Sequence, residues 1–364
     1  MASCLFPGCD RGAPGSSADH RPCARHATYW GGGLYDYIRD IQVDGDGNLY
    51  VSGETEGDGF PVTDPLNPGG NALPDAFVSK LSPNGQQLLY STVIGGSSSD
   101  FPTFLALGPA GGILLAGNTY SLDFPVANAF QPTKADDEEL GIDGFVASIS
   151  PSGAELVYAS YLGGSEDDYV NAIAADGAGN LYVGGGTGSM DFAVANALDS
   201  TLGGSGDGFL AKVLPDGSLG YATFLGGSSG ERLGGIAVDG TDRLITCGFS
   251  GSSDFPLTSD AFDTSMSANG KALLAVLDTA GSAISYATFL GGTGGDECLA
   301  VAVDSSGNFA MAGSTFSDSP PAAPTARRRR LLSPCSRTPR PRARRFSRSA
   351  SATRRAPSRS ARAP

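Results

Sequence analysis

The sequence has few charged residues, few histidines and no long apolar run. Lys, Arg, Asp and Glu make up 17% of the 364 residues, and there are two His and one Trp. No segment approaches the roughly 18 consecutive apolar residues that cross a membrane as a helix, so a membrane-spanning helix is excluded. The N-terminal segment also lacks the apolar core of about 7–15 residues that a signal peptide needs.

Cysteine is also sparse. Six Cys in 364 residues are too few and too widely spaced to predict a disulfide scaffold. Cys247 and Cys298 fall on predicted inner strands, where we interpret them as small buried apolar residues. Hydrophobic residues reach 40%, which is enough for a packed core, so composition does not predict a disordered main body.

The net charge of −14 hides a division between the body of the chain and its C-terminus. Residues 327–364 hold 14 Arg and no Asp, Glu or Lys, which leaves residues 1–326 with 10 basic and 38 acidic side chains, a net of −28. The Arg/Pro/Ser/Ala-rich tail, 319–364, has two interpretations. It is either a disordered basic arm that binds a polyanion such as nucleic acid, or the product of a frameshift in GC-rich DNA. The abrupt change within a repeat favours the frameshift, and the acidic body would repel nucleic acid.

What the sequence has in abundance is glycine, 53 residues, and internal repetition. A Gly-Gly pair after an aromatic-rich segment recurs five times, at intervals of 64, 68, 63 and 65 residues. The first glycines of the pairs are Gly31, Gly95, Gly163, Gly226 and Gly291. A repeat of this length predicts one supersecondary unit per period.

Four further signals keep phase with the Gly-Gly pair. They are a hairpin such as Ile41–Gly53, an Asp-Phe-Pro motif such as 123–125, a strand beginning Asp-x-Phe such as 75–77, and a Pro-x-Gly turn such as 83–85. Short apolar runs flanked by Asp, Gly and Asn are typical of strands joined by tight turns. Each unit of about 65 residues therefore contains four short strands, which is one blade of a β-propeller. A stacked β-solenoid is the alternative, although its coils are usually shorter.

The fold class is therefore predicted as an all-β β-propeller with four complete four-stranded blades and a partial fifth. The fifth unit runs through Thr315, and its third and fourth strands are missing where Ser319-Pro320-Pro321 leads into the tail. The predicted domains are an N-terminal segment at 1–26, propeller repeats at 27–318 and the tail at 319–364.

Three stretches carry a resemblance to a known family. Residues 161–169 read YLGGSEDDY, 176–183 read DGAGNLYV and 207–213 read DGFLAKV. Together with the spacing of their copies over about 28–318, they resemble the bacterial SBBP β-propeller repeat family. The resemblance implies a propeller in a secreted or cell-surface protein, and the family's members mostly lack an assigned activity.

An acidic residue stands five positions after the first glycine of every pair. These residues are Asp36, Asp100, Asp168, Glu231 and Asp296. In a propeller they occupy equivalent loops, where they form either a cation site, with Ca²⁺ as the candidate, or an acidic rim for a basic or polyhydroxylated ligand. The alternative is that each carboxylate caps N–H groups of its own loop, which we favour because like charges near an axis repel one another.

A second calcium candidate is the turn Asp44-Gly45-Asp46-Gly47-Asn48. An EF-hand loop needs Glu at its twelfth position, where this sequence has Thr55, so a plain hairpin turn is favoured. At the N-terminus, Cys4, Cys9, Cys23 and His26 resemble a Cys₃His zinc knuckle, with a mis-called start upstream of the first blade as the alternative.

No catalytic constellation emerges from the sequence. Both histidines lie outside the blades, and the acidic insertion at 136–139 is interpreted as a solvated loop tip. We therefore predict a non-catalytic interaction or scaffold module with a protein or glycan ligand. The alternatives are a carbohydrate-acting propeller enzyme that uses loop carboxylates and a polyanion binder that uses the tail.

Overall fold

The computed structural model describes residues 28–57, 59–63, 66, 74–135, 141–241 and 243–317. Within these ranges the chain is all-β, with one turn of 3₁₀-helix at Pro109–Gly111. The first sheet contains β1 (Asp36–Val43), β2 (Leu49–Thr55), β3 (Asp75–Leu81) and β4 (Leu88–Ile94). The second contains β5 (Asp100–Leu107), β6 (Ile113–Thr119), β7 (Asp143–Ile149) and β8 (Leu156–Leu162).

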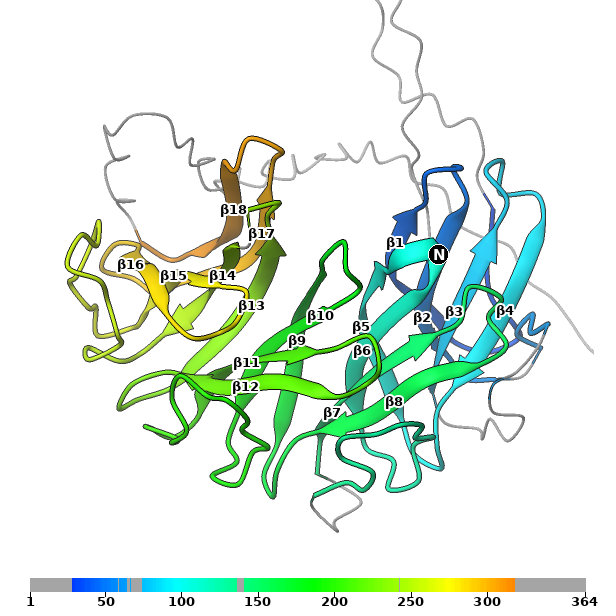
Figure 1. The fold of residues 1–364 in the computed structure, drawn as a ribbon, viewed down its shortest axis with the longest axis horizontal. Helices are drawn as coiled ribbons and strands as arrows, with labels where there is room; N and C mark the ends of the chain where they lie inside the picture. Colours follow the sequence, from blue (N-terminus) through cyan, green and yellow to red (C-terminus); the bar gives the residue numbers. More distant parts are fainter. Residues whose placement is uncertain are drawn as a thin grey trace, which may run out of the picture. The chain divides into compact units, whose positions relative to one another are not determined.

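The later repeats follow the same plan (Figure 1). The third sheet contains β9 (Asp168–Ala175), β10 (Leu181–Thr187), β11 (Asp207–Val213) and β12 (Leu219–Leu225). The fourth contains β13 (Glu231–Val238), β14 (Arg243–Ser250), β15 (Lys271–Asp278) and β16 (Ile284–Leu290). In the fifth repeat β17 (Asp296–Val303) pairs with β18 (Phe309–Thr315). Four complete blades and a partial fifth are therefore confirmed.

Every sheet is an antiparallel meander in which each strand pairs with its sequence neighbours. The Asp/Gly/Asn turns join the first two strands, and Gly47 at φ +83° shows why glycine is needed there. Asp44 closes its turn by accepting the N–H groups of Asp46 and Asn48 at 3.0 and 2.8 Å. These bonds are those of a hairpin turn, as the sequence favoured over an EF-hand loop.

Neighbouring sheets pack face to face, with the first strand of each sheet against the first strand of the next. Three apolar clusters lie at the boundaries between successive complete sheets. In the first three repeats the Phe at the position of the Asp-Phe motif packs on the Phe of the third strand, for example Phe192 on Phe209 with ring centroids 4.7 Å apart. In the fourth repeat Phe255 packs instead on Phe289 of the fourth strand. Because a four-stranded sheet has two apolar faces, only a neighbour on each side buries both.

The two-stranded sheet of the fifth repeat exposes residues that a third strand covers in the other repeats. Residues 312–315 of β18 are exposed, whereas the corresponding residues 247–250 of β14 are buried or half-buried. In β14 the third strand, β15, supplies that cover. Among the described residues of the fifth repeat, no third strand follows β18.

Cys247 and Cys298 form a disulfide, so their interpretation as unpaired apolar residues was wrong. Cys247 lies on β14 and Cys298 on β17, 51 residues apart, with 5.6 Å between their Cα atoms. Both are buried, as predicted, but they meet across the boundary between the fourth sheet and the two-stranded sheet. The prediction failed because residues on different repeats become neighbours only when the sheets stack.

Several predictions fall on residues that the structure does not describe. They are the N-terminal segment 1–26, the insertion 136–139 and the tail 319–364. Trp30, by contrast, is described, and residues 28–30 form no strand. Its ring packs edge-on against Phe60, and its indole N–H donates to Ser79 Oγ at 3.2 Å.

Candidate functional site

The five acidic residues of the repeat occupy equivalent positions, each as the first residue of an inner strand. In each case the carboxylate accepts the N–H of the second glycine of the preceding Gly-Gly pair, at 2.5–2.9 Å. The pairs are Asp36 with Gly32, Asp100 with Gly96, Asp168 with Gly164, Glu231 with Gly227 and Asp296 with Gly292. These contacts are the loop caps that the sequence offered as the alternative to a metal site.

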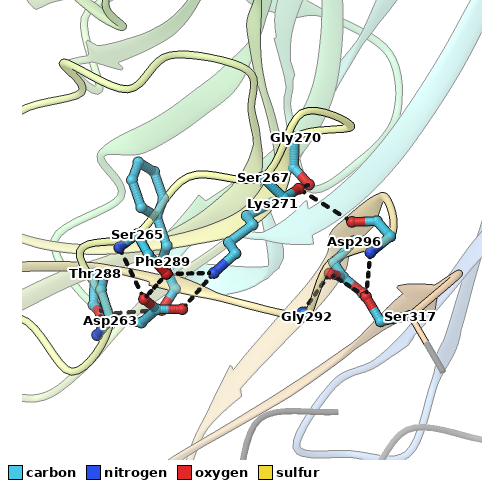
Figure 2. A network of polar contacts seen from close by, with 11 residues as sticks. Asp263, Ser265, Ser267, Gly270, Lys271, Thr288, Phe289, Gly292, Asp296 and Ser317 are labelled. Atoms are coloured by element: carbon cyan, nitrogen blue, oxygen red, sulfur yellow. Dashed lines mark hydrogen bonds and ion pairs between the residues drawn. The ribbon is translucent and has the colours of Figure 1, made fainter. Parts of the chain in front are cut away.

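A serine hydroxyl donates to four of the same carboxylates. Ser121 Oγ donates to Asp100 at 2.9 Å, and Ser189 Oγ donates to Asp168 at the same distance. Glu231 accepts the hydroxyl of Ser250, the last residue of β14, at 2.8 Å and the N–H of the loop residue Ser252 at 3.1 Å. Ser317 Oγ donates to Asp296 at 2.9 Å. Figure 2 shows the last of these networks. These four carboxylates therefore each link two loops of one repeat.

The Asp of the Asp-Phe-Pro motif has a clamping role that the sequence did not predict. Asp123 Oδ1 accepts both the N–H and the hydroxyl of Ser97, at 2.7 and 2.8 Å. Asp191 and Asp254 bind Ser165 and Ser228 in the same way. The signal was a Ser two residues after the first glycine of the second, third and fourth pairs, in phase with the Asp.

A second buried carboxylate approaches each of three Gly-Gly pairs. It is the first residue of the third strand: Asp75, Asp143 and Asp207. A Cβ on Gly95, Gly163 or Gly226 would collide with that Asp, which explains why these positions need glycine. At Gly95 the same Cβ would also contact Asp100, so Asp75 and Asp100 both approach one glycine.

Burial changes the acidity of these carboxyl groups. Burial, together with the charges of Asp100 and Asp123, raises the pKa of Asp75 to about 7. Burial likewise raises the pKa values of Asp100 and Asp168 to about 6, against hydrogen bonds that lower them. All three side chains are at most 3% exposed, so these acids do not present themselves to a substrate in solvent.

Replacing Asp75 with Asn is expected to stabilise the protein at alkaline pH. A native pKa near 7, against 3.8 for the free residue, means that the native state binds more protons than the unfolded state from about pH 4 to 7. Stability therefore falls as pH rises through that window and is unaffected by this group below it. At pH 8, Asp75→Asn should gain on the order of 1–3 kcal/mol in the free energy of unfolding.

Urea unfolding at pH 4, 6 and 8 measures this effect. Asp216→Asn is the matched control, because Asp216 is an exposed turn residue whose pKa is lowered by bonds from Ser218. A gain at pH 8 that is no larger for Asp75→Asn than for the control would contradict the prediction.

No metal centre is assembled in the described part of the chain, where no group of three or more His, Cys, Asp or Glu side chains is placed to hold an ion. The Ca²⁺ ring at Asp36, Asp100, Asp168, Glu231 and Asp296 stays a prediction, and the contacts of each residue favour capping. The predicted zinc ligands Cys4, Cys9, Cys23 and His26 lie outside the described residues. No helix in the described ranges is long and apolar enough to cross a bilayer.

The repeated four-stranded sheets and their loop caps define a protein built of β-propeller blades. The family model described as "Beta-propeller repeat", SBBP, matches residues 27–61 and 157–193, which confirms the resemblance seen in the sequence. No curated protein sequence matches the chain.

Solved structures with some likeness include an extracellular domain from B. thetaiotaomicron and the Pan2 WD40 domain of Neurospora crassa. The first is 11% identical with a TM-score of 0.37, over 78% of this chain and 27% of that one. The second is 11% identical with a TM-score of 0.31, over 76% of this chain and 86% of that one. The chain thus spans about a quarter of the first of these relatives.

Proposed function

We propose that this protein is a non-catalytic interaction or scaffold module that acts outside the cytoplasm, on a cell surface or after secretion. One observation carries the proposal: in all five repeats the acidic residue caps its own Gly-Gly loop. These carboxylates accept hydrogen bonds from N–H and hydroxyl groups of the loops, so they stabilise the repeat. Acid–base catalysis on a sugar instead needs carboxyl groups that reach the substrate.

Two further findings support a location outside the cytoplasm. The Cys247–Cys298 disulfide fits an oxidising compartment, because such bonds persist mainly in secreted and surface proteins. The SBBP repeat matches agree with the exported proteins that the family resemblance implies.

The test combines turnover with binding, on the full chain. We expect no release of reducing ends from polysaccharides between pH 5 and 8, and saturable binding of labelled protein to bacterial cell envelopes that unlabelled protein competes away. Asp168→Asn replaces the carboxylate that accepts the N–H of Gly164 and the hydroxyl of Ser189 with an amide, so it should weaken these bonds and lower Tm. It should leave the turnover at its baseline.

Two results would contradict the proposal. One is hydrolysis that rises with protein concentration and disappears in Asp168→Asn. The other is binding to envelopes that never saturates.

A further inference from the structure

A pocket of about 270 Å³ opens at the boundary between the third and fourth repeats. Its walls are mainly apolar and come from both repeats: Leu198, Phe224, Leu225, Pro256 and Ile284. The charged residue on the wall is Asp199, whose side chain is exposed. An apolar cavity with one carboxylate suits a ligand that has a hydrocarbon stem and a positive end.

A second carboxylate lies behind the pocket. Gly226 completes the lining, and a Cβ there would collide with Asp207, so Asp207 stands directly against this wall. Asp207 is 1% exposed, its Oδ2 accepts the N–H of Gly203 at 2.8 Å, and its Oδ1 has no hydrogen-bond partner among the described residues. Burial raises the pKa of Asp207, and the negative charges of Glu231 and Asp199 raise it further.

The fourth sheet places a lysine where the third has Asp207. Asp207 pairs with Thr187 and Lys271 pairs with Ser250, which is the same register in the two sheets. Lys271 Nζ donates to Asp263 Oδ2 at 2.6 Å and to Ser265 Oγ at 3.1 Å (Figure 2). The lysine is 4% exposed, so its ammonium is buried with a carboxylate as partner.

The partners of this ammonium are repeated in the third sheet. Asp263 Oδ1 accepts the N–H and hydroxyl of Ser265 at 2.9 and 2.7 Å. Asp199 Oδ1 accepts the N–H and hydroxyl of Thr201 at 3.0 and 2.9 Å. The third sheet therefore keeps the carboxylate and the hydroxyl but has an acid in place of the lysine.

We propose that this pocket binds the side chain of a lysine on a partner protein, with its ammonium at Asp199 and its alkyl stem along the apolar wall. The ligand would supply to the third repeat the charge that Lys271 supplies to the fourth. A divalent metal does not fit, because no three acidic side chains in the described ranges are placed around a common point. The inference rests on the proposed function, to which it adds a class of partner.

The probe is Nα-acetyl-lysine N-methylamide, titrated into the full chain and followed by NMR. We expect saturable shifts confined to the pocket, and at least tenfold weaker binding of the norleucine and Nε-acetyl-lysine analogues, which lack the positive charge. Asp199→Asn should weaken the lysine probe about tenfold, the loss of one charge-assisted hydrogen bond. Asp216→Asn, which removes a charge from the exposed β11–β12 turn, should leave binding unchanged.

Asp207→Lys gives the third sheet the lysine that the fourth sheet has at this position, and its ammonium would occupy the site beside Asp199. The variant should bind the probe at least tenfold more weakly and unfold at a higher Tm, because its ammonium meets Asp199. If this variant does not fold, the binding measured for Asp199→Asn tests the proposal. Asp199→Asn should fold, because the side chain is exposed and the amide oxygen can still accept the bonds from Thr201.

Equal binding of the lysine and norleucine probes would overturn the proposal that the pocket binds a lysine side chain. Equal effects of Asp199→Asn and Asp216→Asn on binding of the lysine probe would do the same. Saturable envelope binding that survives such a result would leave the proposed function standing. Envelope binding that never saturates would instead contradict the proposed function, whatever the probe does.

Discussion

Phe209→Ala is expected to destabilise the native protein by about 3–5 kcal/mol, the usual cost of truncating a buried aromatic side chain. Phe209 lies on β11, is fully buried and belongs to the cluster between the second and third sheets. Its ring stacks on Phe192 with centroids 4.7 Å apart. Truncation removes this stacking and leaves a cavity between two sheets that cannot collapse without breaking their register.

Guanidinium unfolding followed by circular dichroism measures the loss. Phe262→Ala is the matched control, because Phe262 is 39% exposed, and its effect should stay below about 1 kcal/mol. A loss for Phe209→Ala that is no greater than for Phe262→Ala would mean that the boundary between these sheets is not the core of the fold.

Removing the disulfide is expected to cost about 4 kcal/mol. The bond closes a loop of 51 residues, and the chain-entropy relation gives a loss of about this size for such a loop. Cys298→Ala should therefore lower Tm, and the two-stranded sheet should become the first part to exchange its amide hydrogens, because it lacks outer strands.

Thermal unfolding with and without dithiothreitol measures the contribution of the bond. Reductant should lower the Tm of the wild type to that of Cys298→Ala and should leave the variant unchanged. Cys335→Ala is the control, and it should behave as the wild type. A non-reduced digest that lacks the peptide joining Cys247 to Cys298 would contradict the bond itself.

The periodic part of the fold could be predicted from the sequence. Strand turns depend on residues close together in the chain, such as Asp44, Gly47 and Asn48, whose conformations and hydrogen bonds are local. The phase of five Gly-Gly pairs was therefore enough to place four complete blades and a partial fifth. The acidic residue after each pair could also be linked to its loop, since Asp168 is only four positions from Gly164 in the sequence.

The sequence by itself thus determined the repeat, its strands and its caps, whereas the tertiary structure alone decided which distant side chains meet. Asp75 and Asp100 both approach Gly95, and Cys247 binds Cys298 over 51 residues. Asp207 stands behind a pocket between repeats, at the position that Lys271 has in the fourth sheet. Such contacts depend on how one sheet stacks on the next. Stacking is set by the packing of whole faces, which no local pattern of residues specifies.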